Sequence, residues 1–150
     1  MLSFAATWFF TQIAPAPQIT ALPPTIVQDA GNAAIKCIFA VGPGEINYGA
    51  FEYEGWTRDS DGEVSSSRTP VKVRFPDDED GVRRTCVVEV ELESKGDQQA
   101  VQDHVSSFLR TPGFQSGVTR VWVHERSRKI QFFPDLTSDR PDIRFVISAL

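Results

Sequence analysis

The sequence predicts an α+β fold: a mainly antiparallel β-sheet of about seven strands, with one helix, about residues 97–110, packed on one face. Two patterns indicate this fold. Apolar and polar residues alternate in several short segments, and helical spacing appears only once. A chain of 150 residues with 41% hydrophobic content is long enough for one domain and its core. Short turns join most of the segments, which favours antiparallel neighbours.

The first segment, residues 1–16, is apolar, and the chain carries no charged side chain before Asp29. Its apolar run is too short to cross a bilayer core of about 30 Å as a helix, but it suits the core of a secretory signal. No Lys or Arg precedes the run, and prolines follow both candidate cleavage sites, Ala14 and Ala16. Two interpretations therefore stay open: a secretory signal peptide, or an uncleaved apolar segment that packs on the domain or on a membrane surface.

Residues 17–32 are rich in proline and lack periodicity, which predicts an extended linker. Residues 33–150 then form a single α+β domain, and the residues before it are expected to be dispensable for folding. The first predicted strand is residues 35–41, with Ile35, Cys37, Phe39 and Val41 on one face. A Gly-Pro-Gly turn follows, and residues 46–54 form the second predicted strand.

The rest of the chain alternates more clearly. Residues 57–67 are polar and predict a loop, and strands are predicted at 69–75, 86–92, 118–124, 129–133 and 142–148. The strand at 86–92 is the clearest, with Cys86, Val88, Val90 and Leu92 toward the core and glutamates toward water. The helix is predicted from an apolar stripe that begins at Ala100, with Asp97 near its start and Pro112 after its end.

The two cysteines, Cys37 and Cys86, both fall on the predicted core-facing side of their strands. If those strands are neighbours, the sulfurs approach each other. An exported protein would then contain a disulfide worth about 3–4 kcal/mol in the chain-entropy model. The alternative is a pair of reduced, buried cysteines that act as small hydrophobic side chains.

A binding surface is predicted on the strand at 118–124. If Val121 and Val123 face the core, then Arg120, Trp122 and His124 form an exposed row, and Trp and Arg are favoured anchors at interfaces. The alternative places Trp122 under the helix or the N-terminal segment. Trp56, at the end of the second predicted strand, has the same two interpretations.

Charge and motifs exclude several classes of function. The net charge of −5 argues against a protein that neutralises nucleic-acid phosphates, and any partner is expected to be neutral or basic. Two cysteines and two histidines without metal-ligand spacing predict no metal site, and no cofactor is expected. Residues 59–63 match only a fragment of a calcium loop, because Arg68 stands where a bidentate glutamate is required. His104 and the serines at 65–67 form no catalytic pattern.

These observations favour a small exported, non-enzymatic binding or accessory protein of a periplasm or envelope, with a protein or a small neutral ligand as its partner. One alternative is a cytoplasmic inhibitor or immunity-type protein, which would cover a basic protein with the acidic residues 77–80, Glu89, Glu91 and Glu93. A second alternative is an enzyme without a recognisable motif. No transmembrane span is expected.

Overall fold

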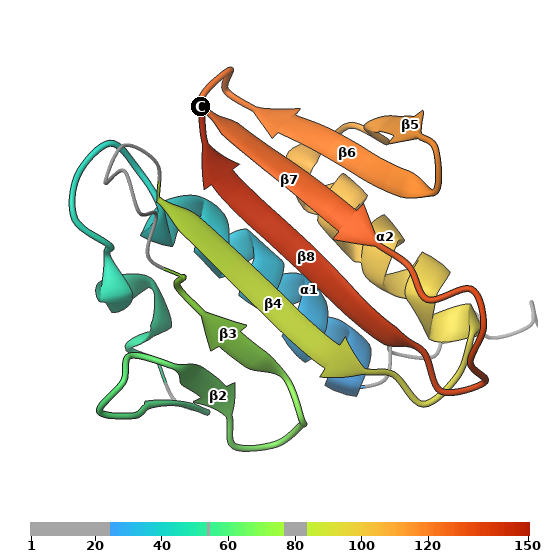
Figure 1. Ribbon diagram of the computed structural model, residues 1–150, viewed down its shortest axis with the longest axis horizontal. Helices are drawn as coiled ribbons and strands as arrows, with labels where there is room; N and C mark the ends of the chain where they lie inside the picture. Colours follow the sequence, from blue (N-terminus) through green and yellow to red (C-terminus); the bar gives the residue numbers. More distant parts are fainter. Residues whose placement is uncertain (1–24, 54, 77–83) are drawn as a thin grey trace, which may run out of the picture.

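The computed structural model describes residues 25–53, 55–76 and 84–150. These residues form one eight-stranded antiparallel sheet in the order β1-β2-β3-β4-β8-β7-β6-β5. Figure 1 shows that α1 and α2 lie side by side behind the sheet, and neither of these helices of the described residues covers its front face. The predicted α+β class and antiparallel sheet are thus confirmed.

The helices and strands follow one another along the chain with mostly short connections. In chain order they are α1 (Thr25–Ala40), the short 3-10 helix η1 (Tyr48–Phe51), β1 (Trp56–Arg58), β2 (Val64–Ser66), β3 (Lys72–Arg74), β4 (Thr85–Glu91), α2 (Gly96–Leu109), β5 (Phe114–Ser116), β6 (Thr119–His124), β7 (Arg128–Phe133) and β8 (Asp142–Ala149). The central pair, β4 and β8, is hydrogen-bonded along its whole length, from Thr85 opposite Ser148 to Glu91 opposite Asp142.

The beginning of the described chain differs from the prediction. Residues 35–41 are not a strand, because they continue α1, and residues 46–54 contain η1 in place of a second strand. Residues 25–32 of the predicted linker are the first two turns of the same helix. Residues 1–24, which include the predicted signal segment and the start of the predicted linker, lie outside the described residues.

The helix α1 forms because its buried side chains recur at helical spacing along the whole segment. Ile26, Val27, Ala30, Ala34, Cys37 and Ile38 are all buried, and they form one stripe that faces the sheet and α2. The segment from Ile35 to Val41 was predicted to be a strand because nearly every residue there is apolar. Such a segment fits the two-residue period of a strand and the 3.6-residue period of a helix equally well. The helix packs against β4, β8, β7 and α2, and it supplies a large part of the core.

The second half of the sequence follows the prediction closely. The helix α2 matches the predicted helix, and β4, β6, β7 and β8 match predicted strands. The side chains of Cys86, Val88, Val90 and Leu92 are buried, as alternation predicted. The short strand β3 lies inside the strand predicted at 69–75. The three-residue strands β1, β2 and β5 were not predicted, and most of β1 and all of β2 lie in the segment 57–67 that was predicted to be a loop.

The two helices approach each other closely where Gly31 of α1 meets His104 of α2. A Cβ atom at residue 31 would lie 2.4 Å from His104 Cδ2, so only glycine fits there without a shift. The His104 Nε2 atom lies 2.9 Å from the Asn32 Oδ1 atom, which can only accept, so Nε2 carries the hydrogen. Burial lowers the pKa of His104, which favours this neutral form of the ring.

A chain that starts at Gly31 is therefore expected to lose its cooperative unfolding transition, contrary to the domain boundary predicted from the sequence. It would lack Ile26, Val27 and Ala30 from the core and the buried carboxylate of Asp29. Urea unfolding followed by tryptophan fluorescence measures this, with a chain that starts at Thr25 as the control. A cooperative transition of unchanged midpoint in the shorter chain would show that the first turns of α1 are not part of the folding unit.

Gly31→Ala is expected to destabilise the protein by about 1–3 kcal/mol, because the new methyl group overlaps the His104 ring. In a His104→Ala background the same substitution should stabilise by about 0.5–1 kcal/mol, since alanine is the better helix former. Chemical denaturation of the four proteins of this double-mutant cycle measures both effects. The same sign in both backgrounds would contradict the close approach of the helices at this point.

Candidate functional site

The predicted cysteine pair is brought together in the structure. The Sγ atoms of Cys37 and Cys86 are 2.02 Å apart, which is disulfide-bonding distance, and both residues are completely buried. Cys37 lies on α1 and not on a strand, so the pair joins the helix layer to the central strand β4. The pairing was predicted correctly although the element that carries Cys37 was not, because both cysteines face the same core.

The predicted exposed row on β6 faces the helices. Trp122 has no exposed surface, packs against Phe145, and donates from Nε1 to Ser106 Oγ of α2 at 3.1 Å. The other face of β6 carries Val123, which is 45% exposed. The prediction that Trp122 is exposed is thus wrong, and the alternative that places Trp122 under the helix is confirmed. Alternation showed two faces of the strand, but it could not show which face the helix covers.

The remaining residues of the predicted surface also make internal contacts. Arg120 donates to the backbone oxygen of Pro112 at 2.9 Å, which holds the segment after α2. His124 is partly buried, with Nε2 3.8 Å from the Glu125 carboxylate. Trp56 is partly buried too, and its ring packs edge to face on Phe51 with centroids 5.6 Å apart. The four residues therefore do not form one surface.

The sequence patterns did not predict the buried carboxylate of Asp29, which the helix α1 carries into the core. Ser66 Oγ donates to it at 2.7 Å and Thr69 Oγ1 at 2.8 Å, and the Arg68 guanidinium forms an ion pair with it. The partners come from the last residue of β2 and from the segment that connects it to β3, so Asp29 holds that connection against the helix. One signal was available, because Asp29 is the first charge in an otherwise apolar stretch.

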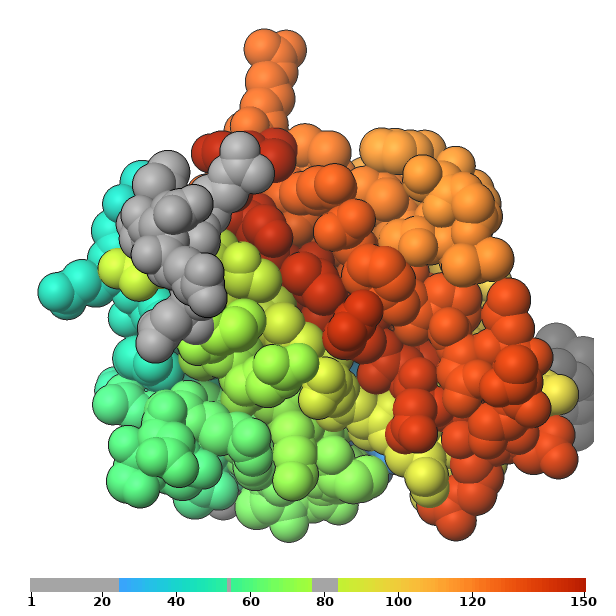
Figure 2. Space-filling model, viewed as in Figure 1, coloured from blue at the N-terminus to red at the C-terminus, as the bar shows by residue number. Residues whose placement is uncertain are grey.

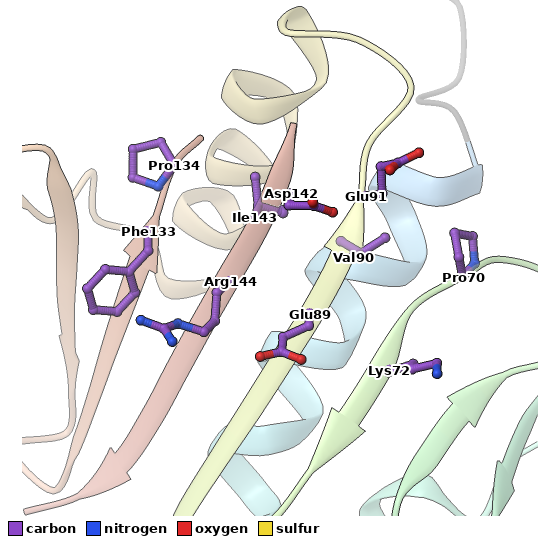
Figure 3. Close-up of a pocket in the computed structure, with 10 residues that line it drawn as sticks. All are labelled: Pro70, Lys72, Glu89, Val90, Glu91, Phe133, Pro134, Asp142, Ile143 and Arg144. Atoms are coloured by element: carbon purple, nitrogen blue, oxygen red, sulfur yellow. The ribbon is translucent and has the colours of Figure 1, made fainter. Parts of the chain in front are cut away.

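The front face of the sheet carries a shallow groove of about 540 Å³. Figure 2 shows this face, with the side chains of β4 and β8 running side by side across it. One row of cross-strand neighbours alternates in charge and ends on an aromatic ring: Lys72 on β3, Glu89 on β4, Arg144 on β8 and Phe133 on β7. In Figure 3 the Arg144 side chain points toward Phe133, with Cζ 4.8 Å from the ring centroid.

Two carboxylates stand opposite each other at one end of the groove. Glu91 of β4 and Asp142 of β8 are direct cross-strand partners, and like charges at such positions repel. Arg140 pairs with Glu91 at 2.9 Å, and Figure 3 shows the Asp142 carboxylate directed toward β4. No ion pair among the described residues includes Asp142. This end of the groove is therefore a place where a cation of a partner would be stabilised.

The carboxylate of Asp135 fixes the backbone beside this pair. The carboxylate accepts from Thr137 N at 3.0 Å and from Asp142 N at 3.1 Å. The backbone N–H of Asp135 donates to the side-chain oxygen of Gln98 of α2. Backbone hydrogen bonds, first from Thr137 and then from Asp142, lower the pKa of Asp135. The loop that delivers Asp142 to the groove is thus held in place at both ends.

A second hollow, of about 400 Å³, lies on the helix side of the molecule between α1 and the segment 47–53. Lys36 is its charged residue. The Lys36 Nζ atom donates to the backbone oxygen of Ala50 at 3.3 Å and lies 4.3 Å from the centroid of the Tyr53 ring. Burial lowers the pKa of Lys36.

Residues 59–63, which match a fragment of a calcium loop, form a turn in the structure. The Asp59 carboxylate accepts from the backbone N–H groups of Asp61 and Glu63, which makes residues 59–63 a turn between β1 and β2. Within the described ranges no three His, Cys, Asp or Glu side chains are grouped so that they could hold a metal ion. The acidic run at 77–80 lies outside the described residues.

Comparisons with known proteins give no further assignment. No family model matches the chain, and no match was found among curated proteins or among solved structures. Within the described part of the chain, neither helix is long and apolar enough to cross a membrane.

Trp122→Ala is expected to lower the free energy of unfolding by about 3–5 kcal/mol, because it removes a fully buried indole and leaves a cavity under α2. Val123→Ala on the same strand is the control, since its half-exposed side chain should cost about 1 kcal/mol or less. Urea denaturation measures both. A loss below about 1 kcal/mol for Trp122→Ala would contradict the burial of this side chain under α2.

Proposed function

We propose that this chain is an exported, non-enzymatic binding protein that takes a basic partner in the groove on the front face of its sheet. The observation that carries the export half of the proposal is the cysteine pair. Cys37 and Cys86 are the two cysteines of the chain, and they lie at bonding distance in the core. Disulfides persist in oxidising compartments such as the periplasm and are rare in the cytosol.

The binding half of the proposal rests on the charges of the groove. Glu91 and Asp142 repel each other in the free protein, and only Glu91 has a basic partner among the described residues. A lysine or arginine of a partner would relieve this repulsion. The ring of Phe133, on β7 opposite Arg144, offers apolar contact elsewhere in the same groove. An extended basic segment with an apolar residue fits this arrangement better than a compact neutral ligand does.

The alternative of a cytoplasmic inhibitor or immunity-type protein with an acidic surface is less well supported. Glu89 pairs with Arg74 at 2.9 Å and Glu91 pairs with Arg140 at 2.9 Å, so arginines neutralise part of the predicted acidic face. The groove is mixed in charge, and this favours a partner that alternates charged and apolar groups. A cytoplasmic location would also leave the cysteine pair exposed to reducing conditions during folding.

The compartment is tested with the full chain expressed in a bacterium that has an oxidising periplasm. We expect the protein in the periplasmic fraction, shortened by the 14 or 16 residues that a cut after Ala14 or Ala16 removes. Alkylation under denaturing conditions without prior reduction should add no mass to it. Full-length protein in the cytoplasm with two alkylated thiols would contradict export.

Asp142→Asn is expected to act in opposite directions on stability and on binding. It removes the repulsion with Glu91, so the free energy of unfolding should rise by about 0.2–1 kcal/mol, while affinity for a short peptide of alternating lysine and phenylalanine should fall about tenfold. Asp139→Asn is the control, because Asp139 is a fully exposed acid nearby. Isothermal titration and urea denaturation measure the two effects. Equal affinity in both variants would remove the groove from the proposal.

A further inference from the structure

The hollow beside Lys36 is independent of the groove, because it lies on the helix side of the molecule while the groove lies on the open face of the sheet. We infer that this hollow is a binding site for a small organic acid that has one carboxylate and an apolar, aromatic-sized body. Lys36 Nζ would hold the carboxylate, and the rings of Phe39 and Tyr53 would cover the body.

The walls of the hollow are apolar on both sides. Ile35 and Phe39 come from α1, and Ala50 and Tyr53 come from the segment around η1. Phe39 is 56% exposed and Tyr53 is 64% exposed, so two large rings face solvent at the entrance. A volume of about 400 Å³ falls within the range of small-molecule sites, about 300–1,000 Å³.

The polar groups of the hollow favour an anion. Lys36 has three N–H donors, and its backbone acceptor, Ala50 O, uses one of them. Asn47 uses its side-chain oxygen to accept from Gly49 N at 3.1 Å, which leaves its amide NH₂ group as a donor. Two donor side chains therefore point to an acceptor ligand, and the ammonium group favours a charged one over a neutral one.

The ammonium group of Lys36 has an aromatic neighbour but no carboxylate partner among the described residues, so it can still bind an anion. The Tyr53 ring lies 4.3 Å from Nζ and stabilises the cation through its π face, but it satisfies no hydrogen bond. The six ion pairs among the described residues do not include Lys36. Because Lys36 is partly withdrawn from water, a carboxylate that replaces the remaining water is bound more strongly than it would be at a fully exposed lysine.

The edge of the site is fixed by packing. Phe39 rests edge to face on Phe108 of α2, with ring centroids 6.2 Å apart, so the ring at the entrance is supported from the second helix. Cys37, the next residue after Lys36, is bonded to β4 and fixes this turn of α1 against the sheet. The wall of the site that α1 forms is thus supported by the packing of the fold.

The test uses the full chain with three probes that differ only at their polar end: 3-phenylpropionate, the corresponding amide and the corresponding amine. Amide chemical shifts in two-dimensional NMR measure where each probe binds and how tightly. We expect the acid to shift the signals of Lys36, Ala50 and Tyr53 with a dissociation constant at least about tenfold lower than that of the amide, and the amine to bind more weakly still. Equal affinity for acid and amide, or shifts confined to the groove on the sheet, would overturn the inference.

Lys36→Met is the matched variant, because it keeps a long flexible side chain and removes the charge. It should weaken binding of the acid about tenfold or more, whereas Lys95→Met, at an exposed lysine of the segment before α2, should leave it unchanged. Both variants must retain the far-ultraviolet circular dichroism of the parent. An undiminished affinity in Lys36→Met would overturn the inference.

A measurement on the unmodified protein covers the case in which Lys36→Met does not fold. The carbon-13 signal of the Lys36 Cε atom reports the pKa of its amine, and a bound carboxylate should raise that pKa because it stabilises the ammonium form. A pKa of Lys36 that stays unchanged at saturating acid would overturn the inference. Neither result depends on the compartment or on the groove, so the proposed function stands or falls separately.

Discussion

The burial of α1 against the centre of the sheet is the constraint on which the rest of the structure depends. The helix carries almost no charge, and its small residues Ala30, Gly31, Ala33 and Ala34 are buried, which lets both the sheet and α2 approach it closely. Three of its polar side chains each contact a different neighbour. Asp29 holds the β2–β3 connection, Asn32 meets His104 of α2, and Lys36 reaches the segment around η1. The bond from Cys37 to Cys86 then ties the helix to the strand it covers.

Apart from the short helix η1, the described chain consists of two halves with the same order of elements. In each half a helix is followed by a meander of four antiparallel strands, first α1 with β1–β4 and then α2 with β5–β8. The last strand of each half is its longest, and these two strands, β4 and β8, pair at the centre of the sheet. This arrangement places the chain's best-formed strands where both their neighbours are hydrogen-bonded, and it leaves the three-residue strands β1 and β5 at the edges. Short edges of this kind limit unwanted pairing with other chains.

The helices and strands that were predicted correctly are those with one buried face and one solvent-exposed face. In β4 the valines alternate with glutamates, and in α2 polar residues surround a narrow apolar stripe, so only one period fits each segment. The helix α1 has no solvent-exposed face that is clearly more polar than its buried face, and the alternation at residues 35–41 was compatible with a strand. Prolines upstream strengthened the wrong interpretation, because they suggested that order begins after residue 32.

The candidate sites were less predictable because each depends on contacts between segments far apart in the sequence. The face of β6 that carries Trp122 could be assigned only once the position of α2 was known. The repulsion between Glu91 and Asp142 requires the pairing of β4 with β8 in one particular register, and a shift of one residue would bring different side chains together. The hollow at Lys36 requires α1 to be a helix, since only then do Ile35, Lys36 and Phe39 lie on one side and face Tyr53.

The groove on the sheet and the hollow beside Lys36 lie on opposite layers of the fold, yet the bond between Cys37 and Cys86 restrains the elements that form both. Cys86 belongs to β4, the strand that presents Glu89 and Glu91 to the groove, and Cys37 belongs to the turn of α1 that presents Lys36 and Phe39 to the second hollow. A helix that could slide along the sheet would move its side chains relative to the segment around η1, whereas a helix bonded to β4 cannot slide without breaking the bond. The covalent link therefore does more than limit the unfolded chain: it keeps the wall that α1 forms at one site in register with the strand that forms the floor of the other.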